Sequence, residues 1–362
     1  MFFSKLFLSL LVFLVSTFAY AESDMYGAIE IGSKGIKGVV IQMVGESDEG
    51  NMEVRKELEP QNKTAILPSA TDDAVNAVGE IFNEITQKYN IPNDHIFIYG
   101  SSGVALNPNK EELANKIKEK TGRELDFITV EQEAQFAFDG VVPKNRRGQV
   151  AFIDIGGGNI KGSYLEQPEG KLTSFGIPLG TSKFERLIND SRGETSFLAK
   201  AEELRVKELI PKIRDISERK PGLMNLKRVY LAGGISWAMS TLIRPDQRTS
   251  FSRLSVEDVT TFHNRVTKNF RKLFEPDLSR ISNSTRGKVE AEIAKTKTVY
   301  SENGYIAGAE ILKALSSELK FKDKDAIFFA RNAMQAIPLG YLQSMIDNVD
   351  KDKKKQVDED KL

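Results

Sequence analysis

Hydrophobic positions along the chain follow two spacings, one typical of strands and one typical of helices. Short apolar runs rich in β-branched residues, such as Ala28–Ile31 and Val150–Ile155, predict buried strands. Elsewhere apolar residues recur every three or four positions, which predicts helices. The clearest example is Asp72–Tyr89, where Val78 and Phe82 share one face with their neighbours. Strands that alternate with helices indicate an α/β fold.

Both spacings continue through the chain. Further strands are predicted at residues 36–41, 95–99, 125–130, 160–165, 228–231 and 325–329. Further helices are predicted at residues 110–121, 131–140, 195–219, 256–273 and 305–319, with a last one that ends near residue 346. The strand pattern restarts after a basic link, Pro143–Gly148. We therefore expect an N-terminal domain over residues 22–145 and a second domain over residues 146–346.

The two ends of the chain differ from its body. Lys5 is the first charge, Leu6–Phe18 is almost entirely apolar, and Ala19-Tyr20-Ala21 follows. This pattern predicts a cleavable signal peptide over residues 1–21 and a periplasmic or secreted protein. An uncleaved anchor is the alternative, although about 20 apolar residues are needed to span a bilayer. No later stretch predicts a membrane span, and the charged tail, residues 347–362, is expected to be disordered.

Composition excludes several classes of function. The chain has 51 basic and 51 acidic residues, so its charge indicates neither nucleic acid nor an anionic membrane as a partner. It has no cysteine, which excludes disulfides. Its two histidines, His95 and His263, lie far apart in the sequence, which argues against a histidine metal site or a serine–histidine triad.

A glycine-containing hairpin occurs twice. The sequences EIGSKGIKG at residues 30–38 and DIGGGNIKG at residues 154–162 share five of nine positions, and both begin with an acid. Glycines in such a turn let backbone N–H groups point at phosphate oxygens, and a lysine adds a positive charge. The predicted phosphate-binding residues are Gly32, Ser33, Lys34, Lys37, Gly156, Gly157, Gly158, Asn159 and Lys161. Glu30 and Asp154 are predicted to hold a hydrated divalent cation between the two loops.

These hairpins are similar to the two phosphate loops of the actin, sugar kinase and heat-shock-protein ATPase superfold. More closely, the chain resembles the exopolyphosphatase/guanosine pentaphosphatase family over roughly residues 26–345. Further segments carry this resemblance: Thr129–Gln135, Pro178–Thr181, Leu254–Val259 and Gly304–Ala309. The resemblance implies two ribonuclease H-like domains that flank a phosphate-binding cleft. It also implies that Glu133 is a general base that activates water and that the divalent cation is Mg²⁺ or Mn²⁺.

Several positions depart from the family pattern. Glu30 and Lys34 stand where the family usually has aspartate and asparagine, and Ala105 stands where it has an arginine. Lys161 reverses the charge of an acidic position, and Gln135 replaces another arginine. These changes remove a metal-side carboxylate and add cations, which favours a site that binds an anion without cleaving it. Alternatively, Lys34, Lys37 and Lys161 replace the missing arginine as phosphate contacts.

The leading prediction is a metal-dependent phosphoanhydride hydrolase that releases terminal phosphate from polyphosphate or a related chain. The alternative is a degenerate member that binds a phosphorylated ligand or a partner protein without turnover. A nucleotide-driven kinase or actin-like filament protein is a third hypothesis, because the turn at Gly233-Gly234 resembles an adenosine-side loop of the superfold. The expected partner is polyphosphate or a phosphorylated small molecule. A homodimer is the expected assembly.

Overall fold

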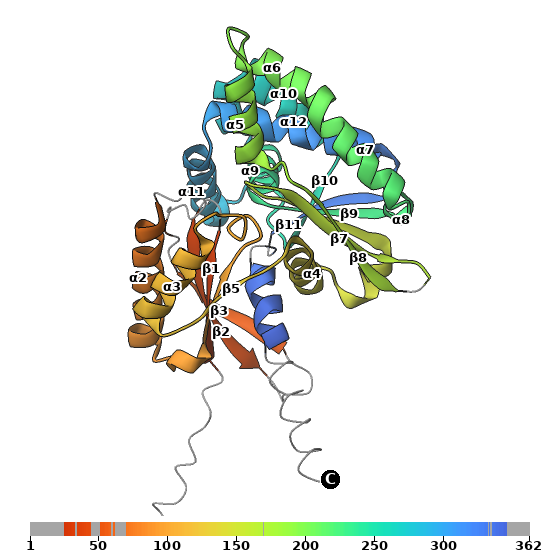
Figure 1. Ribbon diagram of the computed structural model, residues 1–362. Coiled ribbons are helices and arrows are strands. Elements are labelled where there is room, and N and C mark those ends of the chain that lie inside the picture. Colours follow the sequence, from red (N-terminus) through yellow and green to blue (C-terminus); the bar gives the residue numbers. More distant parts are fainter. Residues whose placement is uncertain are drawn as a thin grey trace, which may run out of the picture.

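The computed structural model describes residues 25–32, 35–44, 51–58, 61, 70–168, 170–331, 333 and 335–345. The predicted signal peptide, the charged tail, and the loop residues Ser33 and Lys34 lie outside the described residues. The described chain forms two β-sheets, each covered by helices (Figure 1). This confirms the predicted α/β class.

The first sheet has the strand order β3-β2-β1-β4-β5. Its first three strands are antiparallel, and β4 and β5 continue in parallel with β1. The strands are β1 (Met25–Ile31), β2 (Ile36–Val44), β3 (Asn51–Glu57), β4 (Ile96–Gly100) and β5 (Leu125–Phe127). Helices α2 (Thr71–Tyr89) and α3 (Lys110–Thr121) bury their apolar faces against this sheet. The helical spacing in the sequence thus corresponds to the buried side of α2.

The second sheet repeats this design and adds one edge strand. Its order is β10-β11-β9-β6-β7-β8, with β8, β7 and β6 antiparallel and with β9 and β11 parallel to β6. The strands are β6 (Val150–Ile155), β7 (Ile160–Glu166), β8 (Lys171–Ile177), β9 (Arg228–Ala232), β10 (Phe251–Leu254) and β11 (Ala326–Ala330). Each sheet therefore begins with the glycine hairpin that is repeated in the sequence.

A layer of helices covers the second sheet (Figure 1). These helices are α5 (Thr181–Ser191), α6 (Phe197–Leu204), α7 (Ile210–Arg219), α8 (Gly222–Asn225), α9 (Gly234–Ile243), α10 (Val256–Lys268), α11 (Asn283–Val299) and α12 (Glu302–Glu318). A π-helical turn, η4 (Arg205–Leu209), joins α6 to α7. The 3-10 turns are η2 (Asn93–His95), η3 (Lys144–Gln149), η5 (Phe270–Phe274) and η6 (Phe321–Asp323). No helix among the described residues is both long and apolar enough to cross a membrane.

Two helices connect the halves of the molecule. Helix α4 (Val130–Val141) follows the first sheet in sequence but packs against β7 and β8 of the second. Conversely, helical residues 335–345 follow the second sheet and return to the first, where Leu342 joins a core with Ala28 and Ile41 (Figure 1). The two connecting helices thereby place the start of α4 at the junction between the sheets.

Candidate active site

The sequence repeat is also a structural repeat. Glu30 pairs with Lys37 across the first hairpin, and Asp154 pairs with Lys161 across the second. The turns close with the same hydrogen bond, because Gly32 N donates to Gly35 O and Gly156 N donates to Asn159 O, both at 2.9 Å. Each half of the molecule therefore presents an acid, a glycine turn and a lysine in the same register.

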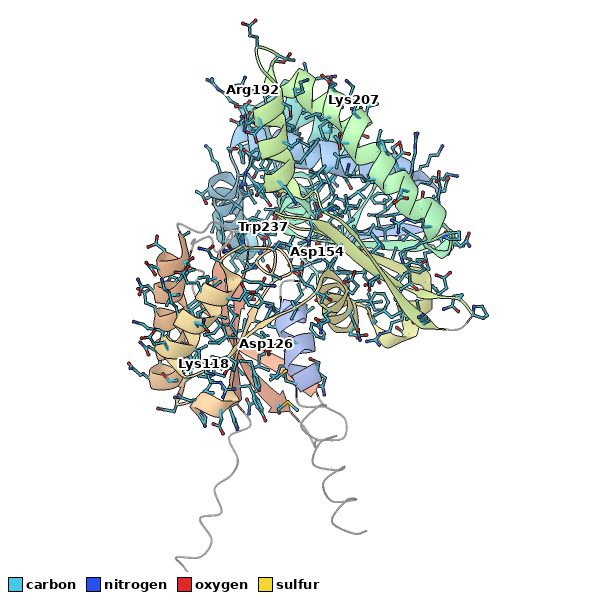
Figure 2. All side chains as sticks on the ribbon, viewed as in Figure 1. Lys118, Asp126, Asp154, Arg192, Lys207 and Trp237 are labelled. Atoms are coloured by element: carbon cyan, nitrogen blue, oxygen red, sulfur yellow. The ribbon has the colours of Figure 1, made fainter. Side chains whose placement is uncertain are left out.

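The second hairpin forms a buried charged centre with α4. The Lys161 ammonium lies 2.7 Å from Glu133 Oε1 and 3.0 Å from Asp154 Oδ2. All three side chains are nearly inaccessible to water. Asp154 lies at the junction of the two halves, as its label shows (Figure 2). One lysine thus joins the predicted general base of α4 to the predicted metal ligand of β6.

Ser102, which follows β4, holds the other oxygen of Glu133. Its backbone N–H and its hydroxyl donate to Glu133 Oε2 at 3.0 and 2.6 Å. The same hydroxyl accepts a hydrogen bond from Asn159 Nδ2 at 3.0 Å. Asn159, Ser102, Glu133, Lys161 and Asp154 therefore form one continuous network that joins both halves of the molecule.

This network keeps the Glu133 carboxylate ionised. Burial alone raises the pKa of Glu133, but the charge of Lys161 and the hydrogen bonds from Lys161 and Ser102 outweigh it and lower the pKa below its usual value. Burial likewise opposes the charge of Lys161, whereas Asp154 and Glu133 raise its pKa well above the ordinary value. A lysine and a carboxylate, both charged, therefore face each other at neutral pH.

The acid of the first hairpin lies close to this centre. Glu30 pairs with Lys37 at 3.7 Å, and the Lys37 side chain is partly exposed. Burial, and then the charges of Glu30 and Glu133, raise the pKa of Tyr99, which lies opposite Glu30 on β4. The Tyr99 hydroxyl is buried and has no hydrogen-bond partner among the described residues. Glu30 and Glu133 thus approach one buried tyrosine from two elements.

A cavity of about 420 Å³ opens beside the second glycine turn. Gly157, Gly158 and Asn159 line it on one side, and Lys183 and Arg186 of α5 line it on another. Backbone amides of a glycine turn next to two exposed cations suit an anionic ligand. The predicted turn residues therefore border a space that can receive a phosphate group.

Two glycines outside the hairpins allow other segments to pack closely against the second hairpin. A β carbon at Gly180 would lie 2.4 Å from Gly156 O and 2.5 Å from Asn159 N. Gly233, whose φ is +90°, packs against Asp154 in the same way, because a β carbon there would lie 2.7 Å from Asp154 Oδ1. Ser102, Gly180 and Gly233 were not predicted as site residues, although each belongs to a short segment of glycine, serine or threonine that follows a strand.

The predicted metal ligands do not fit a resident divalent ion. Asp154 already accepts from Lys161, and Glu30 pairs with Lys37. The described residues contain no group of three or more acidic, histidine or cysteine side chains that could hold a metal. An ammonium between two carboxylates takes the position where a cation would be held. Magnesium binding stays a prediction, and the pairing of both acids with lysines argues against it.

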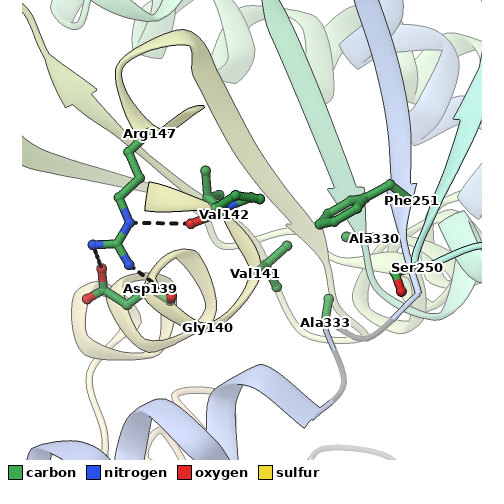
Figure 3. A pocket seen from close by; sticks show the side chains of 10 residues that line it. Asp139, Gly140, Val141, Val142, Arg147, Ser250, Phe251, Ala330 and Ala333 are labelled. Atoms are coloured by element: carbon green, nitrogen blue, oxygen red, sulfur yellow. Dashed lines mark hydrogen bonds and ion pairs between the residues drawn. The ribbon is translucent and has the colours of Figure 1, made fainter. Parts of the chain in front are cut away.

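A second cavity, of about 410 Å³, lies at the opposite end of α4 (Figure 3). Apolar side chains such as Val141 and Phe251 line most of it. Arg147 borders it with an ion pair to Asp139 Oδ1 at 3.0 Å and a hydrogen bond to Val142 O at 3.3 Å. This lining suits an anion less well than the cavity beside the glycine turn.

Comparisons with known proteins agree with the fold. An exopolyphosphatase-like protein superposes with a TM-score of 0.61 at 15% identity, covering 89% of this chain and 99% of that one. An exopolyphosphatase from Cytophaga hutchinsonii gives a TM-score of 0.59 at 16% identity, with 90% and 98% covered. A Ppx/GppA family member from Aquifex aeolicus gives 0.54 at 14% identity, with 86% and 96% covered. The fold is therefore of the actin-like ATPase type, as predicted.

Sequence comparisons give the family. A bifunctional 3-dehydroquinate synthase/phosphatase from Fusobacterium nucleatum is 22% identical over 155 residues, 39% of this chain and only 23% of that protein. The match thus spans about a quarter of the length of that relative. The model of the Ppx/GppA phosphatase family matches residues 37–320, which include the second glycine hairpin, Glu133 and most of both sheets. The chain therefore belongs to the Ppx/GppA phosphatase family.

Proposed function

We propose that this protein is an exported phosphoanhydride hydrolase that releases the terminal phosphate of polyphosphate or a related phosphate chain. Membership of a phosphatase family supports a hydrolase activity. The observation that carries the proposal is the position of Glu133, an ionised carboxylate fixed by Ser102 and Lys161 next to a glycine turn. A general base has to lie beside the reacting group in its proton-free form.

In the proposed step, water attacks the terminal phosphorus and gives a proton to Glu133. The bond between that phosphorus and the bridging oxygen breaks, and its electron pair stays on the shortened chain. The N–H groups of the glycine turn and the Lys161 ammonium stabilise the negative charge of the phosphoryl oxygens. Asn159 positions Ser102, which in turn orients the carboxylate.

Phosphate release tests this proposal directly. The mature chain is incubated with polyphosphate, pppGpp and ATP, with and without Mg²⁺ or Mn²⁺, so that the assay also tests the predicted metal requirement. We expect release from at least one substrate and a loss of about 100-fold or more in Glu133→Gln, because an amide cannot accept the proton. Glu119→Gln, an exposed change on α3, is the matched control. No release from any substrate would refute the hydrolase.

Export is part of the proposal and is supported by the charge and apolar pattern of residues 1–21. Fractionation of the cells that make the full chain, followed by N-terminal sequencing, tests it. We expect a mature chain that begins at Glu22.

One observation favours a second candidate, a ligand-binding protein without turnover. Lys161 occupies Glu133 Oε1, and a lowered pKa makes the carboxylate a weaker base. This candidate predicts that polyphosphate raises the melting temperature while no phosphate is released. Lys37→Ala and Lys161→Ala should both weaken that stabilisation.

A further inference from the structure

Burying the charged side chain of Lys161 at the centre of the site costs free energy. Lys161, Glu133 and Asp154 bury three charged side chains in one place. Removing such groups from water costs free energy that their mutual attraction often only balances. A buried ion cluster is therefore weak evidence for a stabilising role, and a role in ligand binding would account for it.

The geometry gives Lys161 the contacts that a bound cation would make. Its ammonium touches carboxylates from two elements, β6 and α4, at 3.0 and 2.7 Å. It also lies beside the glycine turn, because a β carbon on Gly156 would be 3.7 Å from Lys161 Nζ. An ammonium has three N–H donors, and the two carboxylates account for two of them. The third is left for a ligand at the turn.

Charge balance supports the same role. Lys161 with Glu133 and Asp154 carries one net negative charge. An acid at position 161 together with a divalent ion would leave the same net charge. A divalent ion that joined the present site would instead sit close to an ammonium, and like charges at short range repel strongly in a buried site. The lysine thus both supplies the positive charge and opposes a metal.

We infer that the Lys161 ammonium replaces a divalent cation in this protein, so that the site binds the phosphate groups of its ligand without metal. This inference rests on the phosphate site of the proposed function but not on turnover. The same lysine explains why Asp154 and Glu30 do not form a metal site: the cation that Asp154 needs is already part of the chain.

Binding of tripolyphosphate to the wild-type mature chain, measured by calorimetry in EDTA, gives the first test. We expect binding in EDTA, and an affinity at least about tenfold weaker in Lys161→Gln, since hydrogen bonds to charged groups are among the stronger ones. Binding that disappears in EDTA and returns with Mg²⁺ would overturn the inference. So would a Lys161→Gln chain that is less stable but binds equally well, because Lys161 would then be purely structural.

The second test uses Mg²⁺ alone and a Lys161→Glu chain, in which three carboxylates meet. We expect Mg²⁺ to raise the melting temperature of this variant by about 3 °C or more and to leave the wild type unchanged. An equal rise in both proteins would overturn the inference. If circular dichroism shows that Lys161→Glu does not fold, the wild type and Lys161→Gln decide the question by the first test.

These measurements separate the inference from the proposed function. A wild-type chain that binds tripolyphosphate in EDTA but releases no phosphate either with or without Mg²⁺ or Mn²⁺ refutes the hydrolase and supports the inference. A chain that binds and cleaves only with Mg²⁺ supports the hydrolase and overturns the inference.

Discussion

At the scale of single residues, the site depends on how Glu133 is held. Its two oxygens have different partners, Lys161 on one and Ser102 on the other. The positive charge and the hydrogen bonds all favour the ionised form, so they offset the effect of burial. A lowered pKa keeps the Glu133 carboxylate free of a proton at acidic pH. It also makes the carboxylate a weaker base.

Ser102→Ala tests this balance. The change removes the shorter of the two hydrogen bonds to Glu133 Oε2 and leaves the burial intact. Burial, which disfavours the charged form, is then less well offset, so the pKa of Glu133 rises. The acid limb of the pH profile for phosphate release therefore moves to higher pH. Ser101→Ala is the matched control, because the backbone hydrogen bond from Ser101 to Ile31 is kept. An acid limb at the same pH in wild type and Ser102→Ala would contradict this account.

Residue chemistry also shows what the sequence could predict. The doubled hairpin identified Asp154, Lys161 and Asn159, since glycine turns between acid and lysine repeat visibly. The family resemblance was needed for Glu133, because an isolated glutamate on a helix has no distinguishing pattern. The sequence shows that Ser102 belongs to a serine–glycine segment after a strand, but not its role, because that role depends on contact with Glu133, which lies 31 residues further along the chain.

At the scale of elements, most strands and helices agree with the hydrophobic spacing, and the differences have local causes. The strand predicted over residues 125–130 ends at Phe127. Thr129 instead caps α4, and its side chain and that of Gln132 exchange hydrogen bonds with each other's backbone. The helix predicted over residues 195–219 contains the π turn at Arg205–Leu209, whose Arg205 forms an ion pair with the buried Glu310.

The contact between α5 and the glycine turn gives a prediction at this scale. Gly180 precedes α5, and a side chain there would collide with the backbone of Gly156 and Asn159. Gly180→Ala should therefore displace the turn, lower the stability by about 1–3 kcal/mol and weaken tripolyphosphate binding. Gly287→Ala, in an exposed part of α11 with open space around it, is the control and should stabilise by about 0.5–1 kcal/mol. Calorimetric binding and urea unfolding measure both effects, and unchanged binding in Gly180→Ala would show that α5 does not position the turn.

Close helix contacts also connect the two sheets. A β carbon on Gly140 of α4 would lie 2.7 Å from Ala336 Cβ, and one on Gly340 would lie 2.8 Å from Phe136 O. Two glycines, one on each helix, thus allow α4 and residues 335–345 to cross closely. The position of Glu133 depends on this crossing, because α4 carries it.

At the scale of the whole molecule, the two halves share a design but differ in their buried charges. Besides Glu133, the buried Glu310 and the part-buried Glu292 have a lowered pKa, and both belong to the second half. Burial raises the pKa of Glu310, but His263, Lys313 and Arg205 together lower it. Burial also raises the pKa of Glu292, and Arg331, Trp237 and Arg248 outweigh it. Each such carboxylate stabilises the fold at a pH above the pKa that it has in the unfolded chain. It loses that contribution as the pH falls through the lower pKa that it has in the folded chain.

Acid should therefore unfold the second half before the first. Trp237, the single tryptophan, donates to Glu292 Oε1 at 2.7 Å and lies in the second half (Figure 2). Because the pKa of Glu292 is lowered from about 4.5, its protonation and the change in Trp237 fluorescence should come below that pH. We expect most of the helix signal in circular dichroism to be lost together with this change, because α5–α12 belong to the second half, while a smaller helix signal from α2 and α3 persists to lower pH. Glu292→Gln should remove the early fluorescence change, because an amide does not titrate. Loss of the whole dichroism signal at the pH of the fluorescence change would mean that the two connecting helices make the halves unfold as one unit.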